Sequence, residues 1–283
     1  MKIAIVGTGS IGSTFAFQLA RNAHDVTVVA RGKRLEQLQA EQAIVTVSGE
    51  RAAVTVSAAL DPAINFDLVL VVVLASQVDA VLPALKTSTA KTVMFMFNTL
   101  EPLNSLRDAV GKERFAFGFP AILASLTNGI LKFVIYTREQ TTIVTDTVWA
   151  KVFSEAGILT VAHNDIESWL HTHVAFVVPM MAISSVAHTR QTGVSWSEAK
   201  TYALAIREGF ALVQRLGDSI TPSSLVILNR APKLMVTAMF WALSRLKLIR
   251  DLGAQGSSEP RALIDKMIAA EPDQSSALRS IRP

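Results

Sequence analysis

Two patterns of hydrophobic and polar residues divide the chain. Up to residue 164, short runs of consecutive apolar residues alternate with helix-forming segments, as in sheets whose strands are buried on both faces. From residue 165 onward the strand signals fade, and apolar positions recur with the helical period of about 3.6 residues. The pattern predicts an α/β domain with a doubly wound parallel sheet over residues 1–164, followed by an all-α domain over residues 165–283.

The first domain is predicted to contain strands, helices and one hairpin in alternation. We expect strands at residues 2–6, 25–30, 67–73, 92–97 and 158–161, and a hairpin of residues 44–47 and 53–56 around Ser48-Gly49-Glu50. Helices are predicted at residues 13–22, 33–42, 76–85 and 147–156, and a β-rich stretch at 115–144 that turns at Asn128-Gly129. In the second domain, breaks are expected at Thr192-Gly193, Gly217-Asp218, Thr221-Pro222 and residues 253–258.

Charge and cysteine content exclude several classes of function. The formal net charge is +4, but the lysines and arginines do not cluster as a nucleic-acid binder requires. The chain has no cysteine, which excludes disulfides, thiolate metal sites and cysteine nucleophiles. Its five histidines show no H-E-x-x-H spacing, so no metal site is predicted.

No membrane segment is predicted. The apolar start of the chain resembles a signal peptide, but its removal would destroy the first strand and the glycine loop after it. The longest apolar stretch of the second half, residues 174–187, is too short to span a bilayer. We therefore expect a soluble cytoplasmic protein.

A glycine-rich loop follows the first strand and opens the first helix, with the sequence Gly7-Thr8-Gly9-Ser10-Ile11-Gly12. In such a loop the first glycine makes the tight turn, the second lets a pyrophosphate approach the backbone, and the third lets helix and strand pack closely. The free N–H groups of the helix N-terminus then bind the phosphates. The strand–loop–helix–strand context predicts a Rossmann domain that binds a nicotinamide dinucleotide.

The residue after the second strand predicts which dinucleotide is bound. NAD-binding domains usually carry Asp or Glu there to bind the ribose 2′-hydroxyl, whereas this chain has Arg31, with Lys33 and Arg34 close by. A guanidinium can bind a 2′-phosphate with two hydrogen bonds. The pattern favours NADPH as the cofactor; alternatively, these residues are solvated cations at the start of a helix.

Taken together, these features resemble the ketopantoate reductase (2-dehydropantoate 2-reductase) family. The resemblance rests on the N-terminal glycine motif, Arg31, the hairpin at 44–56, the strand from Asp67 with Gln77-Val78-Asp79 after it, Asn98 at a strand end, and Asn164-Asp165-Ile166 before Trp169. It implies reduction of a 2-oxo acid by NADPH. It also implies that the first long helix of the second domain supplies a lysine acid and two substrate-binding asparagines.

The chain departs from the family at those catalytic positions. Counted without gaps from Asn164, the lysine falls on His173; counted from Trp169, it falls on His171. A further family lysine falls on Leu74, and the family's Asn-Gly reads Asn98-Thr99 here. The asparagine positions are Val177 and Met181 in the first register, and Ala175 and Pro179 in the second.

We prefer the gapless register, because Asn164 and Glu167 have the spacing of a capping box that would start the helix. His173 is then the candidate acid, since an imidazole with a pKa near 6.5 can donate a proton at neutral pH. It is otherwise a core histidine whose ring bonds a backbone carbonyl. His171 shares a face with Glu167, either as a second candidate acid or as a solvent-facing pair.

Two further candidates come from strand and helix ends. Asn98 ends a central strand, where parallel sheets bind ligands, so it is either a contact to nicotinamide or substrate or a simple turn residue. Glu259 resembles a family glutamate that binds substrate hydroxyls, and is otherwise a helix cap before Pro260.

Three functions remain open at this stage. The first is an NADPH-dependent reductase of a 2-oxo acid or related small carbonyl, with a cleft between the domains made apolar by Val177 and Met181. The second is an NADP-binding sensor without catalysis. The third is an imine-reducing dehydrogenase of the opine type. A homodimer through the apolar helical domain is compatible with all three.

Overall fold

The structure, a computed structural model, describes residues 1–136, 140–253 and 258–283. It divides the chain into two compact units. One unit comprises residues 1–97 and 102–166; the other comprises residues 98–101 and 167–283. The chain therefore enters the second unit two residues after the predicted boundary at 164. The short segment at 98–101 also belongs to the second unit. The hydrophobic pattern did not predict this, because the assignment depends on contacts with residues far along the chain.

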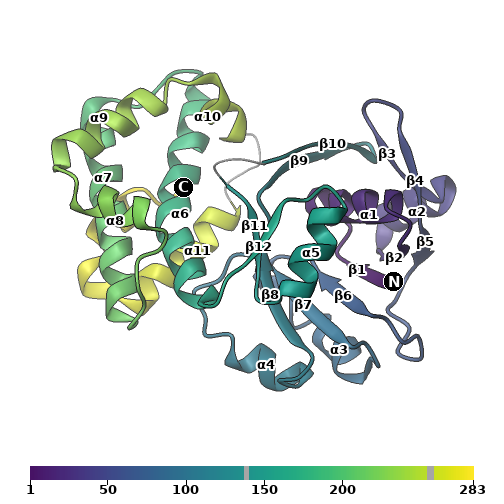
Figure 1. The fold of residues 1–283 in the computed structure, drawn as a ribbon. Coiled ribbons are helices and arrows are strands. Elements are labelled where there is room, and N and C mark those ends of the chain that lie inside the picture. The colour runs from purple at the N-terminus through teal and green to yellow at the C-terminus, as the bar shows by residue number, and fades with distance from the viewer. Residues whose placement is uncertain (137–139, 254–257) are drawn as a thin grey trace. The chain divides into compact units, whose positions relative to one another are not determined.

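An eight-stranded sheet forms the centre of the first unit (Figure 1). Its spatial order is β12-β11-β8-β7-β6-β1-β2-β5, and every neighbouring pair is parallel except β11 with β8. The run β5-β2-β1-β6-β7-β8 is the order of a dinucleotide-binding Rossmann sheet, which confirms the predicted fold class. The strands are β1 (Lys2–Val6), β2 (Asp25–Val29), β5 (Thr55–Ser57), β6 (Leu68–Val71), β7 (Thr92–Met96), β8 (Phe115–Phe119), β11 (Thr142–Val144) and β12 (Thr160–Ala162).

Burial explains why the central strands read as unbroken apolar runs. Ile3, Ala4 and Ile5 of β1 and all four residues of β6 are buried, because helices or loops cover both faces of a parallel sheet. Strands β1 and β6 are in register from Ile3 with Leu68 to Val6 with Val71. The carboxyl end of β1, where the glycine loop starts, thus lies at the middle of the sheet.

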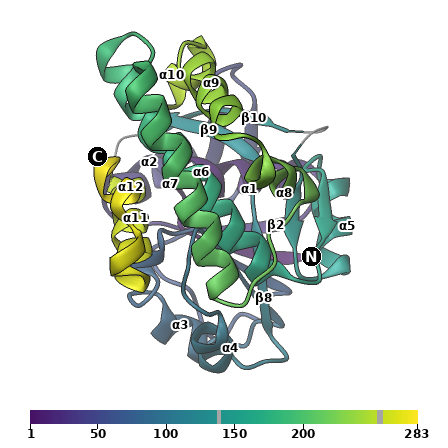
Figure 2. The same cartoon turned by 90° about the vertical axis from the view of Figure 1, so that its left-hand side faces the viewer.

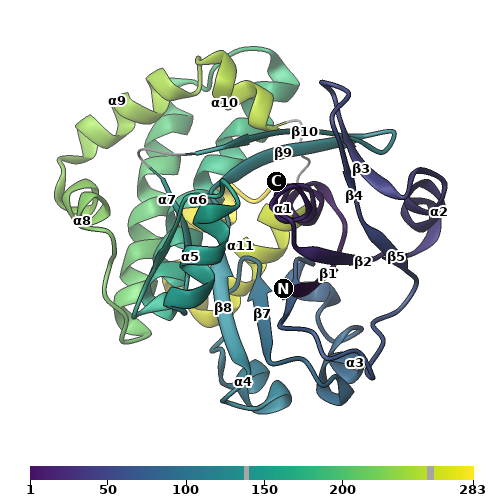
Figure 3. The same ribbon diagram turned by 45° about the vertical axis from the view of Figure 1, so that its right-hand side comes forward.

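A second sheet of four strands, in the order β4-β3-β10-β9, contains the predicted hairpin (Figure 3). The second hairpin strand was predicted at residues 53–56, but it lies earlier in the chain, at residues 51–53. β4 ends at Ala53, and the next residues form β5, which pairs with β2 in the main sheet. The turn at Asn128 and Gly129 has positive φ at both residues, the conformation that a two-residue hairpin needs. The strands are β3 (Ala43–Thr46), β4 (Arg51–Ala53), β9 (Ile122–Thr127) and β10 (Ile130–Ile135).

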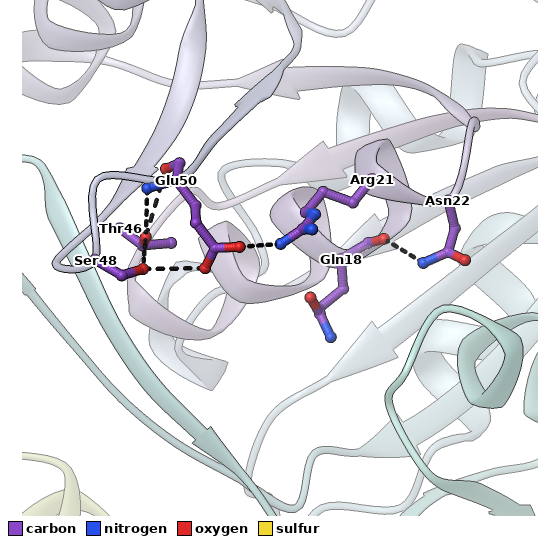
Figure 4. Close-up of polar contacts among 6 residues, drawn as sticks. All are labelled: Gln18, Arg21, Asn22, Thr46, Ser48 and Glu50. Carbon is purple, nitrogen blue, oxygen red and sulfur yellow. Dashed lines mark hydrogen bonds and ion pairs between the residues drawn. The ribbon is translucent and has the colours of Figure 1, made fainter.

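The tip of the β3–β4 hairpin is tied to the first helix by charge (Figure 4). Glu50 forms an ion pair with Arg21 at the end of α1 (Ser10–Arg21), and it accepts a hydrogen bond of 3.0 Å from Ser48. The hydrogen bond from Ser48, and then that from Arg21, lower the pKa of the Glu50 carboxyl. These contacts fix the hairpin on the outside of the unit.

Helices flank the sheet at nearly all predicted places. The predicted helix at 76–85 is the main exception: residues 75–77 form a short 3₁₀ turn, and α3 begins only at Leu82. Pro83 explains this, because proline lacks the N–H that an interior helical turn needs and is tolerated only in a first turn. No element was predicted where α4 lies. The helices are α1 (Ser10–Arg21), α2 (Gly32–Glu41), α3 (Leu82–Thr87), α4 (Asn104–Val110) and α5 (Thr147–Glu155).

The described residues of the second unit form helices and the loops that connect them, and α6 and α7 are its longest helices (Figure 2). The helices part at the predicted breaks, except that residues 254–257 of the last break lie outside the described residues. Gly209 of α7 lies close to α6, since a Cβ there would come within 3.0 Å of the Ala175 Cβ. The helices are α6 (Ile166–Arg190), α7 (Trp196–Arg215), α8 (Ser223–Arg230), α9 (Lys233–Leu243), α10 (Lys247–Leu252), α11 (Ser258–Ala270) and α12 (Ser276–Ser280).

Helix α6 corrects two predictions. It begins at Ile166, so the residue in the N-cap position is Asp165 and the predicted box of Asn164 with Glu167 is one residue out of register. It is also continuous over 25 residues, and by length and composition it is the one helix among the described residues that could cross a membrane. Most of it is buried, as in the core helix of a globular unit. The apolar stretch 174–187 is therefore part of a longer helix.

Candidate functional site

The glycine loop between β1 and α1 is packed too tightly for side chains at two of its three glycines. Gly7 has a φ of +96°, and a Cβ on it would lie 2.2 Å from the carbonyl oxygen of Val72. A Cβ on Gly12 would lie 2.0 Å from the carbonyl oxygen of Gly7. These contacts hold the start of α1 against the ends of β1 and β6, as expected for the first and third glycines of the motif.

Gly9 is different, because a Cβ there would meet no atom within 4 Å. The loop is open at this residue, which is also the N-cap of α1 and gives the helix no side-chain cap. Without a cap, N–H groups of the first turn remain available to an anion. Space above Gly9 and free N–H groups beside it are the features that a pyrophosphate needs, so the loop fits a dinucleotide.

Arg34 holds the loop in place. Its Nε donates to the Thr8 carbonyl at 3.3 Å and its Nη2 to the Ser13 hydroxyl at 3.1 Å, while its Nη1 donates to the Gly129 carbonyl at 3.3 Å. Ser13 in turn donates to the Thr8 carbonyl at 3.2 Å. Burial lowers the pKa of Arg34. Its guanidinium is therefore committed to backbone carbonyls and connects the loop to the β9–β10 turn.

Arg31 and Lys33 are available to a ligand. Arg31 is the N-cap of α2, directly beyond β2, and both side chains are exposed. Neither forms an ion pair among the residues that the structure describes. Of the three neighbouring cations, these two can therefore bind a 2′-phosphate, whereas Arg34 supports the loop.

Asn98 and Glu259 meet in the second unit. Asn98 Nδ2 donates to Glu259 Oε1 at 2.8 Å. Asn98 Oδ1 is buried and has no hydrogen-bond partner among the described residues. Glu259 lies in the first turn of α11, so its carboxylate also interacts favourably with the helix dipole. An unsatisfied buried acceptor is costly, and a donor on a bound molecule would remove that cost.

His173 stacks on Trp169 one helical turn earlier, with ring centroids 4.8 Å apart and planes 9° from parallel. Burial lowers the pKa of His173 to about 4. The imidazole is thus neutral at neutral pH, which corrects the expectation of a titrating acid with a pKa near 6.5. A neutral imidazole still carries one N–H, so it can donate a hydrogen bond to a carbonyl oxygen.

His171 pairs with Asp218 and does not face solvent. It is buried, and its Nδ1 lies 2.6 Å from Asp218 Oδ2 in the loop after α7. Asp218 also accepts a hydrogen bond of 3.2 Å from Ser168. Because His171 and His173 are two residues apart on a helix, they point to different sides. His171 therefore belongs to a buried polar cluster that links two helices.

Val177 and Met181 occupy the positions of the family asparagines in the preferred register, and both are half-buried. They lie on the face of α6 that also carries Trp169 and His173. In the other register, Ala175 and Pro179 are buried in the helix packing. This face of α6 is therefore half-exposed, and it consists of aromatic and apolar side chains with the imidazole of His173 among them.

Sequence reasoning missed the roles of two residues. The sequence pattern places Arg34 with the phosphate-binding cations, although Arg34 lies nearly one helical turn after Arg31. Asp218 was regarded only as part of a break between helices. A short polar residue in a loop carries no local signal for its partner, since the pairing with His171 spans 47 residues.

Comparison with known proteins matches this geometry to one family. The family model described as Ketopantoate reductase PanE/ApbA matches residues 3–145. A 2-dehydropantoate 2-reductase of Vibrio cholerae serotype O1 is 30% identical over 135 residues, which cover 47% of this chain and 41% of that protein. The chain spans about two fifths of the length of the curated relatives it matches.

Solved structures share the fold over the whole chain. The crystal structure of a PanE/ApbA family ketopantoate reductase from Ralstonia eutropha JMP134 superposes with a TM-score of 0.75 at 20% identity, covering 100% of this chain and 96% of that one. The ternary structure of D-mandelate dehydrogenase with NADH and anilino(oxo)acetate superposes with a TM-score of 0.66 at 14% identity, covering 100% and 98%.

Proposed function

Because this chain belongs to the ketopantoate reductase PanE/ApbA family, a family of oxidoreductases that act on CH–OH groups, we propose that it is an NADPH-dependent reductase of a 2-oxo acid or a related small carbonyl compound. The observation that carries the proposal is the glycine loop. It is closed at Gly7 and Gly12 and open at Gly9 above an uncapped helix N-terminus. We expect a soluble cytoplasmic enzyme.

The first unit binds the dinucleotide in this proposal. The backbone from Gly7 to Gly12, with Thr8, Ser10 and Ile11, binds the pyrophosphate, and Arg34 keeps that backbone in place. Arg31 and Lys33 bind the 2′-phosphate, which selects NADPH over NADH. When bound, the reduced nicotinamide supplies a hydride.

The second unit supplies the groups that act on the substrate. The neutral N–H of His173 donates a hydrogen bond to the carbonyl oxygen and stabilises the negative charge that develops there. Asn98 Oδ1 accepts from a donor of the nicotinamide or substrate, and Glu259 fixes the Asn98 amide. His171 supports the helix that carries His173 and does not act on the substrate.

The substrate is proposed to be less polar than ketopantoate. Trp169 and His173 form a flat aromatic surface, and Val177 and Met181 have no hydrogen-bonding group for substrate hydroxyls. An aryl or branched alkyl 2-oxo acid suits these residues better. The structure of D-mandelate dehydrogenase with anilino(oxo)acetate supports this choice by the chemistry of its ligand.

Steady-state oxidation of NADPH tests the proposal, with ketopantoate, an aryl 2-oxo acid and a branched alkyl 2-oxo acid as substrates. The expected order of kcat/KM is aryl or branched alkyl acid first and ketopantoate last. If ketopantoate is the best substrate, the proposed specificity is wrong.

The low pKa of His173 also favours a second candidate, an NADP-binding sensor without catalysis, because the residue in the position of the family acid is uncharged at neutral pH and lacks the imidazolium proton that a general acid would give up. Tight NADPH binding with no turnover on any 2-oxo acid, with or without an added amine, would support the sensor. Turnover only with an added amine would support imine reduction. A homodimer formed through the helical unit is compatible with each of these functions.

A further inference from the structure

Two adjoining hollows lie beside α7 in the helical unit, and none of the residues assigned to catalysis lines them. One has a volume of about 300 Å³ and lies between α7 and α9. The other, of about 440 Å³, lies between α7, the start of α9 and the segment that leads into α12. Leu204 and Lys233 line both hollows, so the two form one continuous surface feature.

The first hollow is apolar. Trp196, Ala203, Leu204 and Leu234 line it, and Trp196 and Leu234 are 45% and 68% exposed. Two such large apolar side chains exposed around one hollow mark a surface that binds something apolar. Thr237, which also lines it, uses its hydroxyl to donate to the Lys233 carbonyl within α9. The two lysines that line this hollow, Lys200 and Lys233, are therefore its remaining polar groups.

The second hollow is basic. One Nη of Arg207 donates to the Ala231 carbonyl, and its Nε is buried with no hydrogen-bond partner among the described residues. Arg207 and Lys233 also form no ion pair within the described part of the chain.

The other two charged residues of the basic hollow already have partners. Arg215 pairs with Glu271. Glu208 accepts from Ser276 Oγ and from the N–H groups of Ala277 and Leu278, at 2.9–3.1 Å, so its carboxylate caps α12. The charge that remains without a counter-ion is positive.

We propose that these hollows form a second ligand site for a single-chain amphiphile with an anionic head group, a carboxylate or a phosphate. The chain lies in the apolar hollow, and the head group binds Lys233 and the Arg207 guanidinium in the basic one. Guanidinium and ammonium groups bind both kinds of head group with charge-assisted hydrogen bonds. Lys200, which also lines the apolar hollow, adds to the attraction.

Charge argues for this ligand over a second copy of the chain. An interface on this surface would enclose Lys200 and Lys233, and lysine is depleted from interface cores because its desolvation is costly. An anionic head group instead neutralises the positive charge where it lies. The site does not depend on the proposed reductase activity.

Titration of the protein with dodecanoate, dodecyl phosphate and dodecanol tests the site, with the two anions kept below their micelle concentrations and dodecanol below its solubility in water. Binding is measured by calorimetry and by the fluorescence of Trp196, which a Trp196→Phe variant assigns among the four tryptophans. We expect saturable binding of one or both anions and binding of dodecanol that is weaker by about tenfold or more, the value of one charged hydrogen bond. Which anion binds more tightly identifies the head group.

The variants Lys233→Gln and Lys200→Gln, with Lys247→Gln as the control outside the hollows, complete the test. Lys233 and Lys247 are both exposed, so folding should be preserved in each. We expect Lys233→Gln to weaken binding of the anions by about tenfold and Lys247→Gln to leave it unchanged. Equal affinity for dodecanol and the anions, or equal affinity of the wild type and Lys233→Gln, would overturn the proposal. So would a stable dimer in light scattering that Leu234→Glu dissociates, because a second copy would then cover the surface.

Discussion

Asn98 donates a hydrogen bond of 2.8 Å to Glu259 although the two residues lie 161 positions apart. The bond uses the amide nitrogen of Asn98 and leaves its buried oxygen as an unused acceptor. It brings together two residues that the sequence offered only as separate candidates, one at a strand end and one at a helix start.

The first prediction concerns this pair. Asn98→Ala should lower kcat/KM for NADPH-dependent reduction by roughly tenfold to a hundredfold, because it removes an acceptor with no substitute. Glu259→Gln should lower it less, since the amide oxygen of glutamine can still accept from Asn98. Steady-state kinetics on the best 2-oxo acid measures both. Equal losses in the two variants would show that the Glu259 charge itself takes part in the reaction.

The second prediction separates the folding role of one glycine from the binding role of another. Gly12→Ala should destabilise the protein by about 1–3 kcal/mol, because the new Cβ would overlap the Gly7 carbonyl oxygen. Gly9→Ala should leave the free energy of unfolding nearly unchanged, since its φ of −66° suits alanine and the Cβ meets nothing. It should nevertheless weaken NADPH binding, because the Cβ occupies the place of the pyrophosphate. Urea unfolding and a cofactor titration test this, and full NADPH affinity in Gly9→Ala would contradict the assignment.

The third prediction concerns the choice of cofactor. Arg31→Asp should weaken NADPH binding by roughly tenfold to a hundredfold, because it replaces a charged hydrogen-bond donor with a repelling carboxylate, and it should leave NADH binding equal or stronger. Arg34→Gln serves as the comparison. It should weaken both cofactors alike, because Arg34 supports the loop that they share. Fluorescence titration with each reduced cofactor gives the ratio, and an Arg31→Asp variant that loses both cofactors equally would refute the 2′-phosphate role.

The fourth prediction is a pH dependence of stability that arises from His173. Its pKa is about 4 in the folded protein and about 6.5 in an unfolded chain, so the unfolded state binds more protons between these values. Stability from this group is complete above pH 6.5 and is lost as the pH falls towards 4. The loss is of the order of 3 kcal/mol, and it should be absent in His173→Gln.

Urea unfolding of the wild type and of His173→Gln at several pH values isolates that contribution, since the other titrating groups are common to both proteins. Parallel curves for the two proteins would mean that His173 is not desolvated. In the wild type, the rate profile should also lack an ionisation near pH 6.5 that belongs to this residue.

The fifth prediction assigns His171 to stability. Asp218→Ala removes the acceptor of the hydrogen bond from the buried His171 imidazole, and an unsatisfied buried donor costs about 1–3 kcal/mol, so the variant should destabilise the protein. Asp218→Asn should cost less, because the amide oxygen can still accept from the imidazole. Thermal unfolding followed by circular dichroism measures both. A loss of turnover in Asp218→Asn at full stability would instead place this pair in the catalytic machinery.

Local rules accounted for most of the elements. The apolar runs predicted the central strands, and the glycine spacing predicted the loop, because the strand, the turn and the start of the helix follow one another directly in the sequence. Two element predictions failed, one because of a proline and one because of a distant strand. Pro83 delayed α3, and the residues after Ala53 left the hairpin because β2 offered them a parallel partner in the main sheet.

The chain by itself thus determined the α/β order, the dinucleotide loop and the cations at the end of β2, all of which follow from short-range periodicity and backbone sterics. Only the tertiary structure decided which of those cations are free and which histidine is buried against a carboxylate. It also decided that His173 is neutral and that Asn98 meets Glu259. Each of these depends on desolvation or on a hydrogen bond between residues distant in sequence, and packing alone determines both.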